Sequence, residues 1–353
     1  MIKFLEEILR TSFEILNSAS IWLIFSFLLA GFLRNILNPL KFQKMLGNTK
    51  LSSILKSTLS GMLLPICSCG VIPLGMSMYF SGAYLGPVLA FMTSTPMINP
   101  VAVLLAFGLL GPKIAGIYVL TGFCLPFLIG IIGNKFGKGE LHAPGMEEFI
   151  ESDYDDDRSF KKKIIDGFNW AFNDLALVVS KYVILGMVMA GFLFTVFPKG
   201  YIEKYLGDPS VLSLGSITIL AMIMYVCAVG HIPFIAALVA SGAAPGVAVT
   251  FLMAGTATNL PELLSMYKLM GKRTVIIYSL TMVISSLGVG YLTNILLSDF
   301  KPVIDFDKNL GSIKAANFLL IEPPEYLKYL CSIIIILLAV KAIYPTVRKR
   351  VIA

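Results

Sequence analysis

The run Pro-Ile-Cys-Ser-Cys-Gly-Val-Ile-Pro at residues 65–73 places Cys67 and Cys69 between prolines in an apolar segment. Proline and glycine weaken helical structure, so we expect this stretch to be unwound. A regular helix would hold the two thiols about 200° apart, whereas an unwound stretch lets both reach one ligand. Thiols prefer soft partners, which indicates a thiophilic ligand rather than Na⁺, Mg²⁺ or a sugar. The alternative is that the cysteines only pack and the prolines only kink a helix.

A related run at residues 225–233 carries Cys227 and His231, four residues apart and on one helical face. With the first two thiols they form a soft set of three sulfurs and one imidazole. His231 could be a ligand, a proton carrier or a satisfied core residue, and its position one turn after Cys227 favours a role in the site, with proton coupling as the candidate role. We expect Cys124 and Cys331 to be packing residues in the core.

Two polar stretches interrupt other apolar segments, at Asn99-Pro100 and at Asn259-Leu260-Pro261-Glu262. Polar side chains at such a break satisfy freed backbone groups or line a path, so Asn99 and Asn259 are candidate substrate-binding residues. An acid at membrane depth, here Glu262, is a candidate proton-coupling group. The alternative places Glu262 at the membrane interface, where it complements the dipole of a helix N-terminus.

The composition identifies the kind of scaffold that holds these residues. Of the 353 residues, 57% are hydrophobic and only 14% are charged, with a mean hydropathy of +0.83. These values exclude a soluble enzyme, a disordered chain and a disulfide-stapled secreted domain. The net charge of +7 resides in loops, so nucleic acid is not a predicted partner. We predict an all-α polytopic membrane protein with apolar segments at 15–38, 57–80, 84–110, 113–133, 171–197, 212–240, 246–270, 274–297 and 328–345.

The sequence resembles itself when shifted by 160 residues. About 30 of 120 pairs are identical, and they include glycine, proline and asparagine as well as Cys67 with Cys227. This indicates two tandem repeats. We expect four parts: a first transmembrane repeat (1–133), a charged cytoplasmic linker (134–165), a second transmembrane repeat (166–300), and a loop with an extra transmembrane helix (301–353).

The distribution of basic residues favours inverted repeats. If every segment crosses the membrane, Lys and Arg divide 15 against 13 between the two sides. If 84–110 and 246–270 are re-entrant, each half crosses three times and the division becomes 19 against 9. The second arrangement satisfies the positive-inside rule and puts the linker and the C-terminus in the cytoplasm. The helix breaks then lie near the bilayer midplane.

The run at 65–73, the stretches around Asn99 and Asn259, and the two-half layout resemble the ArsP-type family of predicted permeases. The resemblance covers about residues 15–300. It implies an inner-membrane permease, with export of trivalent methylated or aromatic arsenicals in some members. It also implies thiol recognition by Cys67 and Cys69 and, less surely, by Cys227.

We therefore predict a multi-pass secondary carrier of the inner membrane that exports a thiophilic small molecule by alternating access. The expected substrates are trivalent organoarsenicals such as methylarsenite. Protons are the expected coupling ion. A transmembrane thiol–disulfide oxidoreductase pairing Cys67 with Cys227 is one alternative, and a permease for sulfur species or soft metal ions is another. No nucleotide loop or protease motif is present, so the expectation is no enzyme activity, no cofactor and no resident metal. The expected partners are membrane lipid, the substrate and, as an open option, a second copy of the chain.

Overall fold

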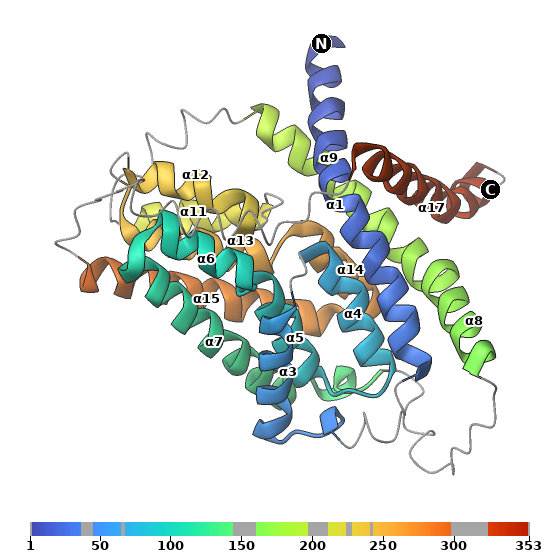
Figure 1. The fold of residues 1–353 in the computed structure, drawn as a ribbon, viewed down its shortest axis with the longest axis horizontal. Helices are drawn as coiled ribbons and strands as arrows, with labels where there is room; N and C mark the ends of the chain where they lie inside the picture. The colour runs from blue at the N-terminus through green and yellow to red at the C-terminus, as the bar shows by residue number, and fades with distance from the viewer. Residues whose placement is uncertain are drawn as a thin grey trace.

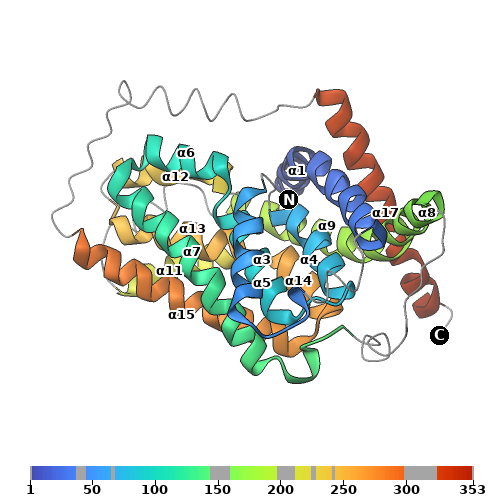
Figure 2. The ribbon, with the colours of Figure 1, turned by 60° about the horizontal axis from the view of Figure 1, so that its bottom comes forward.

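The computed structural model describes residues 2–36, 45–64, 68–143, 160–196, 211–223, 228–240, 243–297 and 324–351. Over these ranges the chain forms helices and turns without strands, as the sequence predicts (Figures 1 and 2). The helices are α1(Ile2–Ile36), α3(Leu51–Leu63), α4(Ser68–Phe80), α5(Leu85–Met97), α6(Pro100–Leu109), α7(Gly111–Phe136), η1(Lys138–Glu140), α8(Phe160–Trp170), the π-helical turn η3(Ala171–Leu175), α9(Ala176–Val196), α11(Val211–Ile223), α12(Ala228–Ala240), α13(Pro245–Ala257), α14(Leu260–Leu269), α15(Lys272–Leu296) and α17(Glu325–Val351).

Several of these helices are long and apolar enough to cross a bilayer. Within the described ranges four qualify singly, and the number rises to six when each bent pair of helices counts as one span. Large apolar side chains such as Leu280, Ile284 and Leu337 are exposed on their outer faces, where lipid tails would cover them. The chain is a multi-pass membrane protein.

The helix limits recur along the chain with a shift of 160 residues, which relates α3 to α11, α4 to α12, α5 to α13 and α6 to α14. Two local contacts recur with the same shift. Asn134 Oδ1 accepts a hydrogen bond from Gly86 N at 2.8 Å, and Asn294 Oδ1 accepts one from Gly246 N at 2.7 Å. Both glycines lie so close to a neighbouring helix that a Cβ would overlap a backbone carbonyl. Small residues thus allow the same close helix packing in both halves.

Helices α3 and α4 form a hairpin that enters and leaves on one face of the protein. Tyr84 N donates to Leu46 O at 3.0 Å, so the residues after α4 lie beside those before α3. Leu85 N donates to Leu141 O at 3.0 Å, which adds the end of α7 to this face. We call it the linker face, because residues 137–143 lead from it into the linker.

The segment 57–80 is therefore not one crossing, contrary to the sequence prediction. It is divided between α3 and α4, and the hairpin that they form is the re-entrant element. The segment 212–240, also predicted as one crossing, is divided in the same way, since α11 ends at Ile223 and α12 begins at Ala228.

The segment 84–110, predicted to be re-entrant, forms two helices with a bend between them, which fits a broken span or a re-entrant loop. Helices α5 and α6 meet at 44° and do not reverse direction. Helix α7 returns antiparallel to α5: Asn134 bonds Gly86 near the linker face, and Tyr118, farther from that face, donates to Met97 O. The counterpart Pro245–Leu269 reads as one 25-residue span. The predicted breaks are present before α6 and α14, and the reversal of chain direction that the structure shows lies between α3 and α4.

Corresponding helices of the two halves run antiparallel. Along α1 and α9, Phe27 lies 6.4 Å from Phe172 and Phe4 lies 6.3 Å from Phe192 between ring centroids. Helices α7 and α15 lie side by side (Figure 1), and Glu140, after the end of α7, accepts from Arg273 N at the start of α15 at 3.1 Å. Inverted repeats would produce such antiparallel pairs, and the inversion stays a prediction.

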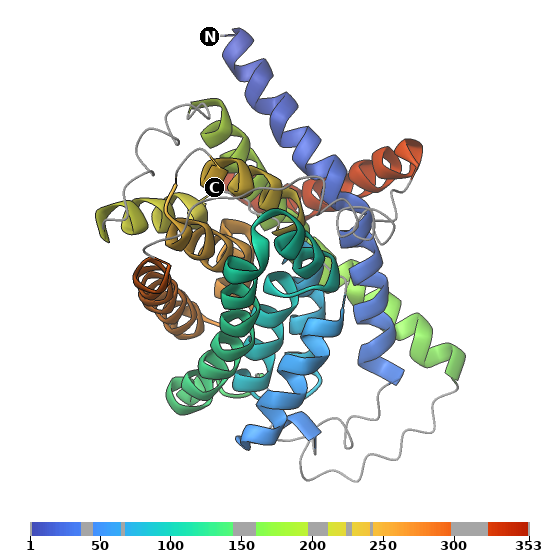
Figure 3. The ribbon, with the colours of Figure 1, turned by 60° about the vertical axis from the view of Figure 1, so that its left-hand side comes forward.

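Helix α17 lies outside these paired helices and packs against α1 and α9 (Figures 1 and 3). Ser20 Oγ donates to Lys328 O at 3.0 Å, and Lys341 Nζ donates to Asn173 Oδ1 at 3.3 Å. Because Ala30, near the end of α1, accepts from Ser77 near the end of α4, α1 ends at the linker face. Helix α17 crosses α1 near its own start, where Ser332 Oγ also donates to Asn17 Oδ1 at 3.1 Å.

Candidate functional site

The predicted thiol cluster falls largely outside the described residues. Cys67 and Cys227 are not among them, and they directly precede the first residues of α4 and α12. Cys69 belongs to the first turn of α4 by its backbone, and its side chain is outside the description. The sharing of one ligand by these thiols therefore stays a prediction.

The other two cysteines differ in burial. Cys331 is buried, as predicted, whereas Cys124 is exposed on α7, so the prediction of core packing for Cys124 is wrong. The apolar segment around Cys124 faces outward at this position, where lipid can cover a thiol as well as protein can. No group of three metal-ligating side chains occurs within the part of the chain that the structure describes.

The first helix break is a buried, well-satisfied polar junction. Asn99 Oδ1 accepts from Ala102 N at 2.8 Å and caps α6. Thr93 and Thr95 are buried, and their hydroxyls donate hydrogen bonds to backbone carbonyls one turn earlier in α5. Tyr118 donates to Met97 O, a carbonyl that the broken helix leaves without an in-helix partner. Asn99 thus holds the break open in a fixed geometry.

The second break repeats this junction and adds an acid. Asn259 Oδ1 accepts from Glu262 N at 3.1 Å, and Asn259 Nδ2 donates to Glu262 Oε2 at 3.2 Å. Tyr278 donates to Ala257 O at 2.5 Å, as Tyr118 does to Met97. The amide oxygen of Asn259 therefore caps α14, and its amide nitrogen holds the Glu262 carboxylate.

Glu262 lies in the protein interior, with 0% of its surface exposed. The carboxylate sits in the first turn of α14, as the alternative of a helix N-terminus requires, and its depth in the membrane stays a prediction. Its Oε1 has no hydrogen-bond partner among the described residues. A carboxyl oxygen in this position is costly unless it takes a proton or a ligand, which marks it as a functional group.

Tyr278 connects the two breaks. Besides Ala257, its hydroxyl interacts with the side chains of Glu262 and of Thr93, which lies in the other half. Sequence reasoning did not single out Tyr118 and Tyr278 as site residues. Their recurrence at a fixed distance after the two asparagines was the signal that could have identified them as part of the junctions.

Helix α4, which contains Cys69, packs against helix α14, which contains Glu262. Both helices end at one cavity, where Phe80 and Leu269 line the wall. Cys69 and Glu262 both lie in the first turns of their helices, at the ends remote from this cavity. A common depth for the two residues stays a prediction.

An equivalent contact exists with the roles of the two halves interchanged. Helix α12 packs against α6 as α4 packs against α14, so each hairpin lies against the second half-helix of the other repeat. His231 lies near the start of α12, half-buried, with its ring 6.0 Å from that of Phe251. The structure thus places His231 beside α13.

The family comparison covers nearly the same region as these paired helices. The family model ArsP_1, described as a predicted permease, matches residues 4–295. The chain belongs to this predicted permease family. A transporter is the class of protein that this membership indicates.

Curated relatives agree with the family. The UPF0718 protein MJ0584 of Methanocaldococcus jannaschii is 26% identical over 333 residues, covering 78% of this chain and 91% of that protein. The UPF0718 protein YcgR of Bacillus subtilis is 24% identical and covers 74% of this chain and 88% of its own length. A Streptococcus mutans protein described as a subunit of a two-component membrane permease complex is 24% identical, with 68% and 79% covered. No solved structure matches the chain.

Proposed function

We propose that this permease is a proton-coupled secondary carrier that exports a thiophilic small molecule, with trivalent organoarsenicals such as methylarsenite as the substrate class. The observation that carries the proposal is the Glu262 carboxyl. It is buried, it has an oxygen without a partner among the described residues, and it lies on α14, which packs against the helix α4 that contains Cys69.

Alternating access fits the arrangement of the helices. A duplicated, inverted core can rock between two equivalent states around a fixed central site. The antiparallel pairs α1 with α9 and α7 with α15 support such a core, and so does the reciprocal packing of α4 on α14 and of α12 on α6. Asn99 and Asn259 provide rigid breaks on either side of the proposed site.

The chemistry assigns a role to each predicted residue. A methylarsenite molecule exchanges two As–OH bonds for two As–S bonds with Cys67 and Cys69, and each exchange releases one water that carries the thiol proton. Cys227 can take over one As–S bond during transfer to the second hairpin. Because these exchanges need no net proton, Glu262 is free to carry the coupled proton, and His231 is the second candidate for that role.

The linker face is the proposed cytoplasmic face. Most of the described basic residues outside the long apolar helices lie there, whereas Lys3, Arg10 and Lys113 lie toward the opposite face. This asymmetry satisfies the positive-inside rule. The described basic residues at the linker face are Lys50, Lys56, Lys135, Lys138, Lys161, Lys162, Lys163, Lys268, Lys272 and Arg273.

The test is methylarsenite accumulation in everted inner-membrane vesicles, with and without an imposed proton gradient. Wild type should accumulate arsenic only with the gradient, and Cys67→Ser/Cys69→Ser should not. Cys124→Ser is the matched control, because its thiol is exposed on α7, away from the breaks. Full activity in the double variant would refute the thiol site. A Cys67–Cys227 disulfide that opens with reductant, together with no uptake by wild type, would instead establish the oxidoreductase.

A further inference from the structure

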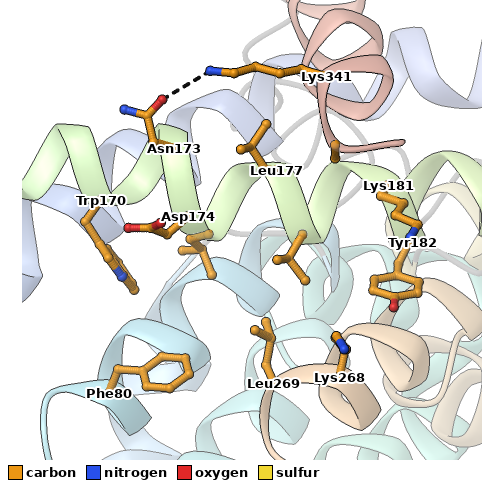
Figure 4. Close-up of a pocket in the computed structure, with 13 residues that line it drawn as sticks. Phe80, Trp170, Asn173, Asp174, Leu177, Lys181, Tyr182, Lys268, Leu269 and Lys341 are labelled. Atoms are coloured by element: carbon orange, nitrogen blue, oxygen red, sulfur yellow. Dashed lines mark hydrogen bonds between the residues drawn. The ribbon is translucent and has the colours of Figure 1, made fainter. Parts of the chain in front are cut away.

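A cavity of about 480 Å³ lies beside the ends of α4 and α14, between them and helices α9 and α17 (Figure 4). The π-helical turn η3 forms part of its wall. Single π-helical turns are rare and frequently occur at functional sites. Most of the wall is apolar, so this cavity differs in character from the polar helix breaks.

Lys181 is the one charged residue of α9, a helix that is otherwise apolar from Ala176 to Val196. Ionisable residues within a membrane helix are costly and usually functional. Its ammonium group lies 5.7 Å from the centre of the Tyr182 ring. Among the described residues no carboxylate forms an ion pair with Lys181 or with Lys268. The cavity therefore contains basic groups without a counter-ion from the described part of the chain.

The charges are distributed unevenly around the cavity. Figure 4 shows Lys181, Tyr182 and Lys268 at one end and Trp170 with Asp174 at the other. A third lysine, Lys341 of α17, bonds Asn173 at the rim. Three lysines against one aspartate favour an anionic ligand, and the apolar wall favours one with a hydrocarbon chain. Tryptophan and tyrosine are the residues that mark the membrane–water interface.

We propose that this cavity binds an anionic phospholipid of the leaflet at the linker face. Its phosphate lies between Lys181 and Lys268, and its acyl chain lies along the apolar wall. Basic pockets between transmembrane helices hold lipid headgroups in this way. The site does not depend on the proposed transport reaction. It gives α17, which lies outside the paired helices, a role in closing the cavity with Lys341.

The chain has two tryptophans, Trp22 and Trp170, and the second lines the cavity. A Trp22→Phe protein therefore reports on the cavity by fluorescence. It is reconstituted in two kinds of phosphatidylcholine vesicle. One contains phosphatidylglycerol with brominated acyl chains, and the other contains phosphatidylcholine with brominated acyl chains. Brominated phosphatidylglycerol should quench Trp170 at a lower mole fraction than brominated phosphatidylcholine. A Trp170→Phe protein, which retains Trp22 in α1, measures quenching by bulk lipid.

Substitution of the lysines tests the headgroup. Lys181→Gln and Lys268→Gln should each reduce the preference for phosphatidylglycerol about fivefold, the usual effect of one lysine near an anionic lipid surface. Lys181→Arg should retain the preference, and Lys56→Gln, at an exposed position of α3, should leave it unchanged. Circular dichroism and gel filtration confirm that each variant is folded.

Three results would overturn the assignment. Equal quenching of Trp170 by the two brominated lipids would show that the cavity has no preference for an anionic headgroup. An unchanged preference in folded Lys181→Gln/Lys268→Gln protein would remove the lysines as its ligands. Loss of the preference on adding millimolar inorganic phosphate at constant ionic strength would make the ligand a soluble anion rather than a lipid.

Discussion

Replacing Tyr278 with phenylalanine removes one buried hydroxyl that joins the two halves of the protein. The change leaves the Ala257 carbonyl without its 2.5 Å donor and removes the interactions with Glu262 and Thr93. Hydrogen bonds inside membrane proteins contribute about 0.6 kcal/mol on average and up to about 1.7 kcal/mol. Because three partners are lost together, we expect unfolding to become easier by about 1.5 kcal/mol, near the upper end of that range.

Tyr118→Phe is the matched variant, since Tyr118 holds the equivalent carbonyl of Met97 at the first break. The position that corresponds to Glu262 is Ala102, so the first junction has no acid. Both variants should lower stability within the range given above, by about 0.6–1.7 kcal/mol, in unfolding titrations with mixed micelles. Only Tyr278→Phe should also displace the pH profile of methylarsenite accumulation.

Two outcomes would contradict this reasoning. If Tyr118→Phe displaces the pH profile as far as Tyr278→Phe does, the effect comes from loosening either break and not from the acid. If Tyr278→Phe leaves the profile unchanged while it lowers stability, the hydroxyl braces the two halves but does not act on Glu262.

Other substitutions test the remaining parts of the structure. Glu262→Gln should abolish the dependence of uptake on the proton gradient while methylarsenite binding persists, and retained gradient dependence would remove Glu262 as the coupling acid. Gly246→Ala should cost about 1–3 kcal/mol because its Cβ overlaps the carbonyl of Gly290, whereas Gly215→Ala, with open space at its Cβ, should be neutral or slightly stabilising in the same unfolding titration. Cys331→Ser should retain transport, since this buried thiol lies on α17 away from both breaks; loss of uptake by correctly folded protein would contradict that.

Much of this architecture could be read from the residues alone, because it depends on local chemistry. Length and apolar composition specify membrane helices. The breaks at Asn99 and Asn259 follow from an asparagine placed directly before a helix with proline in its first turn, and the structure has the caps at those residues. The helix limits of α3 to α6 recur 160 residues later in α11 to α14 for a similar reason. Matching local sequences produce matching local structure.

What required the tertiary structure is the direction of the chain after each break and the surroundings of each polar group. Whether 57–80 or 84–110 turns back depends on contacts such as Tyr84 with Leu46 and Gly86 with Asn134, which join residues 38 and 48 positions apart. The burial of Glu262 and its connection through Tyr278 to the other half depend on packing between helices distant in sequence. Such contacts leave no periodic trace along the chain, because they are set by the folded neighbours of a residue and not by its neighbours in sequence.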